Sequence, residues 1–164
     1  MIFYEEVLRA FQKQKVKYVL VGGIAVNLLG AMRSTADMDI LVEMSDDNLK
    51  KIVGIMKKFG YQVKQPIDPM KIADKRTRTN WIKKKNMKAF NFFKKDELKE
   101  VDIIIESAVS FGEAVKDRVW IKIDDLSLPV ISLDKLIKMK KAGRMVDNLD
   151  IEQLKAIRRL KKKL

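Results

Sequence analysis

The chain has 164 residues, is 47% hydrophobic and carries a formal net charge of +13, which indicates one globular domain rather than a disordered protein. It has no cysteine and no histidine, so disulfides, thiolate zinc sites and cysteine or histidine nucleophiles and bases are excluded. Any metal must be held by oxygen ligands, which favours Mg²⁺ or Mn²⁺, and any general base is expected to be a carboxylate.

No membrane or export signal is expected. The longest uncharged run, residues 18–32, is shorter than the roughly 18 apolar residues that span a bilayer, and the first ten residues lack the order of a signal peptide. We therefore expect a soluble, cytoplasmic protein without a membrane partner. The excess of lysine and arginine favours a polyanionic partner, or else a surface selected for solubility or thermal stability. Composition leaves both open.

The first half of the chain alternates helices and strands. Apolar spacing predicts a helix over 3–14, and a β-branched run predicts a strand over 18–21 that ends at Gly22 and Gly23. A short helix over 24–29 and a strand over 37–42 follow. Ser45 is expected to cap a helix over 46–59, which Gly60 ends.

The second half is predicted to be richer in strands. Strands are expected over 61–64 and 89–94 with a proline-marked loop between them, then a turn at 95–97 and a strand over 100–105. A helix over 111–117, a hairpin over 119–131 and helices over 133–142 and 148–163 complete the chain.

This order predicts an α/β (α+β) fold, a mixed β-sheet flanked by helices with a helical C-terminal extension. We expect a core over 1–110 and a C-terminal hairpin with helices over 111–164 packed on it, as a single domain.

Three features of the sequence predict a phosphate-and-metal site. Gly22 and Gly23 follow a strand and open a helix, which exposes backbone N–H groups to an anion. Asp37 and Asp39, two residues apart in a strand, lie on one face of it, and Asp102 occupies a third strand. Together the carboxylates can form an oxygen cage for one or two divalent ions beside a phosphate-binding turn. Metal-assisted phosphoryl or nucleotidyl transfer needs this combination.

These residues, in this order, resemble the DNA polymerase β-like nucleotidyltransferase superfamily. The resemblance implies a nucleotidyltransferase fold in which Asp37 and Asp39 bind Mg²⁺. It also implies that Asp102 completes the site as a metal ligand or as the base for the attacking hydroxyl. Gly22, Gly23 and the nearby backbone would hold the phosphates of the NTP.

A narrower resemblance concerns two segments. Arg33, Thr35, Asp37 and Asp39 reproduce the R-x-T-x-D-x-D run of the abortive-infection (AbiEii-like) nucleotidyltransferase group, whose members include toxins of toxin–antitoxin pairs. A C-terminal signature of that group falls on Lys140, Gly143, Arg144, Asp147 and Asp150. Val146 stands where the group commonly has a basic residue, and the spacing from Lys140 to Gly143 is one residue shorter than in many members. The resemblance implies nucleotide contacts for Thr35, Lys140 and Arg144, and a cognate antitoxin as a partner.

Several of these residues also have a structural interpretation. Arg33 is expected to contact a triphosphate, but an ion pair with Asp37 or Asp39 is the alternative. Lys140 and Arg144 could face a nucleotide or complement a helix dipole. Asp147 and Asp150 are expected to cap the last helix and to orient Arg144.

Residues 71–99 carry eleven Lys or Arg against three Asp or Glu, with aromatic residues between them. The aromatic side chains are expected in the core and the lysines on a surface that favours a polyanion. The function expected is therefore metal-dependent transfer of a nucleoside monophosphate from an NTP to an acceptor hydroxyl, with RNA or tRNA as the acceptor and a toxin role. The alternatives are a non-catalytic nucleotide- or RNA-binding module, an antitoxin-like partner, or a phosphate-ester hydrolase.

Overall fold

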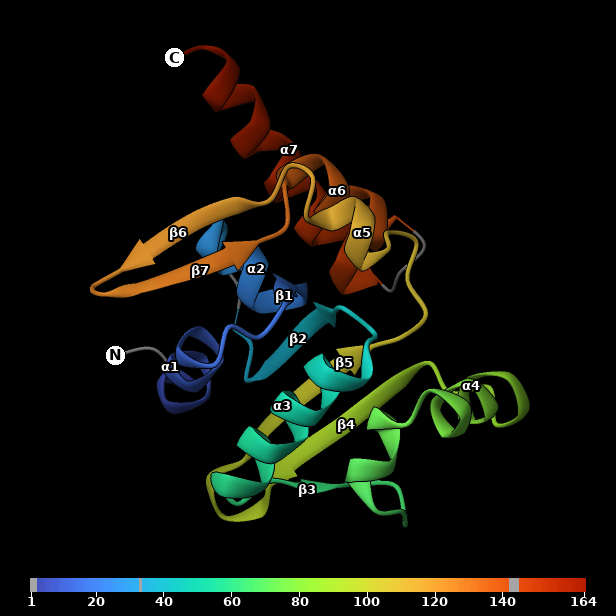
Figure 1. Cartoon of the computed structure of the whole chain (residues 1–164). Coiled ribbons are helices and arrows are strands. Elements are labelled where there is room, and N and C mark those ends of the chain that lie inside the picture. The colour runs from blue at the N-terminus through green and yellow to red at the C-terminus, as the bar shows by residue number, and fades with distance from the viewer. Residues whose placement is uncertain (1–2, 33, 142–144) are drawn as a thin grey trace.

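The computed structural model describes residues 3–32, 34–141 and 145–164, and it confirms the mixed α/β architecture. The chain forms one seven-stranded sheet, in the order β3-β4-β5-β2-β1-β7-β6 (Figure 1). The strands are β1 (Tyr18–Val21), β2 (Asp37–Val42), β3 (Gln62–Val63), β4 (Ala89–Lys94), β5 (Lys99–Ile104), β6 (Val119–Ile123) and β7 (Leu126–Val130). β2 runs parallel to β5, and β1 parallel to β7, while the other neighbours are antiparallel.

Helices pack on both sides of the sheet. They are α1 (Glu5–Lys13), α2 (Gly22–Leu28), α3 (Asp46–Lys58), α4 (Lys75–Lys84), α5 (Phe111–Ala114), α6 (Leu133–Lys140) and α7 (Met145–Lys162), with short 3₁₀ turns at η1 (Pro69–Ala73) and η2 (Lys95–Glu97). In Figure 1, α1 and α3 lie on one side of the central strands, and α2, α6 and α7 on the other, where the C-terminal end of α7 projects from the body. α4 lies at the periphery beyond β4.

The core fixes which side chains of the central strands face inward. Met38 and Ile40 of β2 stand opposite Val101 and Ile103 of β5, and all four are fully buried. Because side chains alternate along a strand, the polar residues between them must face the other side of the sheet. That second face is covered by α2 beside β1 and β2, and no described helix makes a comparable contact with β5 there. The carboxylates of β2 and β5 thus meet on a partly open half of the sheet.

The predicted elements agree with the structure except in two places. α2 begins at Gly22 rather than at residue 24, so the glycine pair belongs to the helix itself. The loop expected between residues 64 and 89 contains η1 and α4. This helix has a weak apolar pattern, because its buried side chains are Trp81 and Arg78, and Arg78 pairs with Asp46 at 3.1 Å. Because α4 has more charged than apolar residues, the apolar periodicity of the sequence does not predict this helix.

The remaining boundaries shift by a few residues. Ser45 caps α3 as predicted, Ser132 caps α6, α5 is one turn long, and α7 begins at Met145. Of the aromatic residues expected in the core, Trp81, Phe90 and Phe92 are buried, and Phe93 is half-buried. The division of the chain into a core over 1–110 and a C-terminal part over 111–164 stays a prediction. Among the described residues, no helix combines the length and apolar character needed to cross a membrane.

Candidate active site

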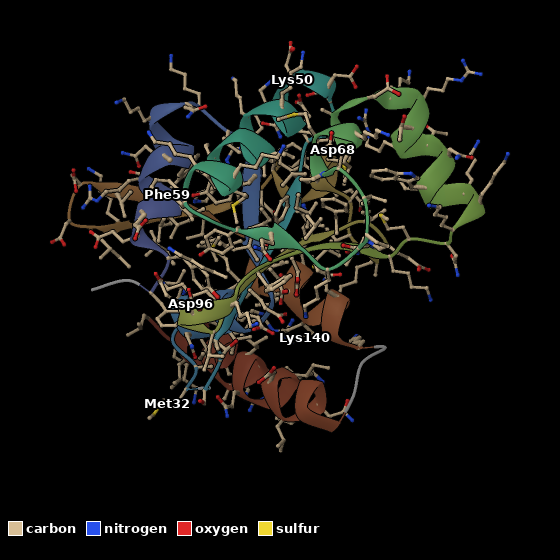
Figure 2. All side chains as sticks on the ribbon, turned by 90° about the horizontal axis from the view of Figure 1, so that it is seen from below. Met32, Lys50, Phe59, Asp68, Asp96 and Lys140 are labelled. Atoms are coloured by element: carbon tan, nitrogen blue, oxygen red, sulfur yellow. The ribbon has the colours of Figure 1, made fainter. Side chains whose placement is uncertain are left out.

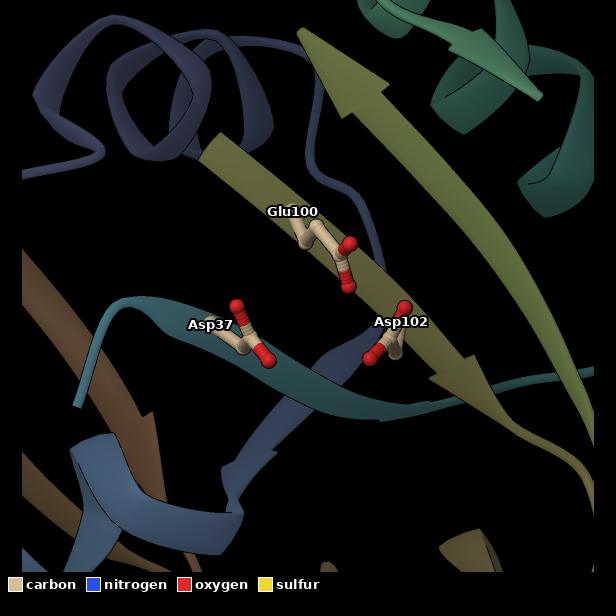
Figure 3. A group of neighbouring side chains, drawn as sticks. All are labelled: Asp37, Glu100 and Asp102. Carbon is tan, nitrogen blue, oxygen red and sulfur yellow. The ribbon is translucent and has the colours of Figure 1, made fainter. Parts of the chain in front are cut away.

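Two strands bring four carboxylates together. In the parallel register of β2 and β5, Asp39 stands opposite Asp102 and Asp37 opposite Glu100. Oxygen atoms of Asp37, Glu100 and Asp102 lie within 4.8 Å of one another, and Figure 3 shows these three side chains gathered over the gap between the two strands. We call Asp39 and Asp102 the inner pair and Asp37 and Glu100 the outer pair. The structure thus brings the three predicted carboxylates together and adds a fourth.

The glycine pair lies directly against the inner pair. Gly22 has a φ of +66°, and a Cβ atom there would lie 2.2 Å from Oδ2 of Asp39. A Cβ on Gly23 would lie 2.7 Å from Oγ1 of Thr35. Both positions therefore require glycine, the first for conformation and close approach and the second for close approach. The predicted glycine turn therefore lies in close contact with both Thr35 and Asp39.

Burial and neighbouring charge act together on the inner pair. Burial, the negative charges of Asp102 and Asp37 and a hydrogen bond with Asp102 together raise the pKa of Asp39 to about 7. Burial and the charges of Glu100 and Asp102 also raise the pKa of Asp37. Without a cation, this site therefore favours a proton on Asp39, because carboxylates in close contact disfavour ionisation of each other. A bound divalent ion would remove that repulsion.

Asn91 of β4 holds Asp102. Its Nδ2 donates to Oδ1 of Asp102 at 2.7 Å, and its Oδ1 accepts from Nε2 of Gln65 at 3.2 Å. The Oε1 atom of Gln65 is buried without a partner among the described residues. The two amides thus form a chain of donors that ends on Asp102. Asn91 escaped the sequence analysis because its role follows from the pairing of β4 with β5, which the sequence does not state.

Glu100 also escaped it, although E-x-D in β5 repeats the spacing of D-x-D in β2. Nζ of Lys64 donates to Oε1 of Glu100, and this hydrogen bond raises the pKa of Lys64. The backbone N–H of Glu100 donates to the Tyr4 hydroxyl at 3.1 Å, and that hydroxyl also bonds to the carbonyl of Ala36. Tyr4 therefore joins the starts of β2 and β5, and burial raises its pKa to about 12, so it stays a neutral donor.

Lys140 approaches the inner pair from α6. It is buried, pairs with Asp150 at 3.1 Å, and its charge lowers the pKa of Asp39. Figure 2 shows Lys140 in the interior, whereas Met32 lies at the periphery. The prediction that Asp150 caps the last helix is wrong, because Asp150 lies within α7 and its buried carboxylate is held by Lys140. A phosphate contact of Lys140 stays a prediction.

Three predicted residues, Arg33, Gly143 and Arg144, lie outside the described residues, as does the side chain of Asp147. Their predicted contacts with a nucleotide, and the ion pair that was the alternative for Arg33, therefore stay predictions.

The donor set fits a hard divalent cation. All candidate ligands are carboxylate oxygens on rigid neighbouring strands, and oxygen ligands are those that Mg²⁺ and Mn²⁺ prefer. The metal-ligand roles of Asp37, Asp39 and Asp102 follow from this chemistry as predictions.

An apolar groove lies elsewhere, near the start of β1. It measures about 550 Å³ and is lined by Phe11, Tyr18, Trp120 and Pro129 among others. It contains none of the residues predicted for the site, and Glu43 is its one acidic residue. The chemistry predicted for the chain thus concerns the carboxylate face, and this groove contributes none of its residues.

Comparison with known proteins identifies the family of the chain. A family model described as aminoglycoside-2''-adenylyltransferase matches residues 4–157, which includes the glycine pair and all four carboxylates. The chain belongs to the aminoglycoside-2''-adenylyltransferase family. This membership confirms the predicted enzyme class, an NTP-dependent nucleotidyltransferase. The narrower resemblance to the abortive-infection group stays a prediction.

Solved structures share the fold of this family member. LnuA, a lincosamide antibiotic adenylyltransferase with lincomycin bound, has a TM-score of 0.63 and 18% identity, over 94% of this chain and 96% of its own. ANT(2'')-Ia, in complex with adenylyl-2''-tobramycin, has a TM-score of 0.55 and 13% identity, over 97% and 94%. An antigenic nucleotidyltransferase-like protein from Paracoccidioides brasiliensis has a TM-score of 0.56 and 15% identity, over 93% and 74%. A comparison with curated proteins found no match.

Proposed function

We propose that this chain transfers a nucleoside monophosphate from an NTP to the hydroxyl group of an acceptor and releases pyrophosphate. The observation that carries the proposal is the register that sets Asp39 opposite Asp102, with Gly22 in contact with Asp39. Asp37 and Asp39 would hold Mg²⁺ or Mn²⁺, with Asp102 as a third ligand or as the base. When bound, the ion would neutralise charge that develops on the transferring phosphoryl group.

The residues of the chain then have separate tasks. The acceptor oxygen forms a bond to the α-phosphorus while the bond to the bridging oxygen of pyrophosphate breaks, and the acceptor proton passes to Asp102. Asn91 holds one Asp102 oxygen at 2.7 Å, which leaves the other to face the reaction. The N–H groups of Gly22 and Gly23, with Thr35, would contact the phosphates, and Arg33, Lys140 and Arg144 would complete that contact.

For the acceptor, we propose a small hydroxylated molecule of the antibiotic kind. The names of the family and of two similar structures point to aminoglycosides and a lincosamide. The charge of this chain favours an acceptor with few positive charges over a polycationic aminoglycoside. Glu97, an acid near the start of β5, is already paired with Lys94 and Lys99, at 2.9 Å each. Glu97 is therefore already balanced by lysines of the chain itself.

RNA or tRNA is a second candidate acceptor, because the basic segment around α4 is exposed. Its exposed lysines and arginine make no ion pair among the described residues. They are Lys71, Lys75, Arg76, Lys83, Lys84 and Lys85. Arg78, counted in the same segment, is buried against α3 and is not available. Neutralising phosphates with these side chains would give binding that weakens with salt. A toxin role with a cognate antitoxin belongs to this second candidate.

One experiment tests the function and separates the acceptors. The protein is incubated with Mg²⁺, each α-labelled NTP and, in separate reactions, an aminoglycoside, a lincosamide or total RNA. Label on the lincosamide, with pyrophosphate released, is the expected result. Label on RNA would support the second candidate, and an RNA shift without pyrophosphate would indicate a binding module. An Asp39→Ala protein that transfers label as well as the wild type would contradict the proposal.

A further inference from the structure

A lysine lies where the outer pair could hold a second ion. Nζ of Lys64 bonds to Oε1 of Glu100, and the charges of Asp102 and Asp37 also act on this ammonium group. Glu100, Asp102 and Asp37 are the three residues whose oxygens lie within 4.8 Å of one another. The ammonium group and a second divalent ion would therefore compete for the same oxygens. We call the space bounded by these three carboxylates the outer position.

The backbone holds Lys64 at this place. Its N–H donates to the carbonyl of Asn91 at 3.2 Å, at the end of the short strand β3. The next residue, Gln65, donates to the side chain of the same Asn91. Two consecutive residues thus reach the two carboxylates of β5, Lys64 directly to Glu100 and Gln65 through Asn91 to Asp102. The hydrogen bond to Asn91 fixes the backbone of Lys64 beside β4. The side chain of Lys64 therefore starts close to the outer position.

We propose that Lys64 is a tethered cation that takes the place of a second metal ion at the outer position. The chain then binds a single divalent ion, through Asp39, Asp102 and Asp37, and the ammonium group balances Glu100. This inference rests on the proposed function, because it assumes that the carboxylates bind metal. It goes beyond that function by giving the number of ions and by assigning Lys64 and Glu100, which the family match does not.

The chain offers a matched control for Lys64. Lys57 has the same side-chain exposure, 49%, and also pairs with one acid, Asp68, at 3.6 Å. Its partner is not among the site carboxylates. Lys57→Met therefore removes one exposed ion pair of the same kind and leaves the outer position unchanged.

The test counts bound Mn²⁺ ions per chain, by calorimetric titration and by the electron paramagnetic resonance signal of free Mn²⁺, with the metal alone as the probe. We expect one ion for the wild type and for Lys57→Met, and two for Lys64→Met. Lys64→Met with Glu100→Gln should return to one, because the second ion then lacks a ligand. Far-ultraviolet circular dichroism confirms that each variant is folded.

Two ions on the wild type, or one on Lys64→Met, would overturn the inference. Nucleotide transfer measured on the same samples separates this failure from that of the proposed function. Transfer that continues with two ions on the wild type overturns the role of Lys64 and leaves the proposed function in place. A wild type that binds no Mn²⁺ and transfers nothing overturns both.

Discussion

The inner and outer pairs occupy equivalent places in the register of β2 and β5 but differ in their surroundings. Asp39 and Asp102 are enclosed by Gly22, Asn91 and the charge of Lys140, and the pKa of Asp39 rises to about 7. Asp37 is exposed, and Glu100 is balanced by Lys64. Thus, the inner carboxylates, which are buried and which Lys140 balances only in part, have the greater need for a metal ion. Where a lysine compensates the charge, the need for a metal is smaller.

Replacing Asp102 should have the largest effect among the changes that test this comparison. Asp102→Asn keeps the shape of the side chain but removes its charge and its ability to accept a proton. General-base catalysis typically contributes 10²–10⁴-fold, so we expect transfer to fall on the order of 10³-fold. Single-turnover rates with labelled NTP measure it. A rate within threefold of the wild type would show that the inner pair does not carry the reaction.

Gly22→Ala should have the next largest effect. The new Cβ would lie 2.2 Å from Oδ2 of Asp39 at a φ of +66°, so either the turn or the carboxylate must move. Displacement of a reacting group by about 1 Å can cost on the order of 10²-fold, and we expect a loss of that size in transfer. Gly54→Ala is the control, because that glycine lies in α3 with nothing within 4 Å. Equal activities of the two variants would contradict the contact.

Replacing Asn91, which positions Asp102, should have an intermediate effect on transfer. Asn91→Ala is expected to lower kcat about 10–100-fold, as loss of a supporting hydrogen bond to a metal-site ligand commonly does, with little change in KM for NTP. Asn91→His, whose ring N–H can donate to Asp102, should recover part of the loss. Asn80→Ala, on the exposed side of α4, controls for loss of an amide. A rise in KM with unchanged kcat would contradict the positioning role.

The smallest expected effect is a change in the free energy of unfolding with pH, measured in the absence of metal. The pKa of Asp39 is about 7 in the folded chain, above its unfolded value near 4, so the folded state binds the additional proton between these values. The free energy of unfolding should therefore fall as pH rises from 5 to 7, by at most about 1.4 kcal/mol per pH unit from this group. Denaturant unfolding of the wild type and of Asp39→Asn, compared at each pH, isolates the contribution of Asp39 to this pH dependence. A difference that rises with pH would contradict the shift.

The sequence predicted the site wherever a local pattern sufficed. Gly22, Asp37 and Asp39 lie within one segment whose strand, turn and helix follow from periodicity and glycine, and the alternation of V-D-I-I-I placed Asp102 on a strand of its own. The facing of Asp39 and Asp102 depends on a parallel register between strands about 60 residues apart, which no local pattern of the sequence states.

Contacts across the sheet were not predictable in this way. Asn91 and Lys64 act through the pairing of β3, β4 and β5, and in the sequence they are ordinary polar residues of a basic segment. The Lys140–Asp150 pair joins α6 to α7, whereas the sequence predicts a nucleotide contact for Lys140 and a cap for Asp150. α4 was missed because its charged residues outweigh its apolar ones, and Arg78 substitutes for an apolar side chain in the core.

The most direct test of the central claim compares one member of each pair under the same conditions. Mg²⁺-dependent release of pyrophosphate is measured for Asp39→Asn and for Glu100→Gln, with an acceptor that the wild type modifies. The account predicts that Asp39→Asn loses transfer on the order of 10²-fold, because the site loses the charge of a metal ligand, whereas Glu100→Gln keeps it within about tenfold. The reverse order, with Glu100→Gln inactive and Asp39→Asn active, would contradict the claim that the inner pair is the catalytic centre.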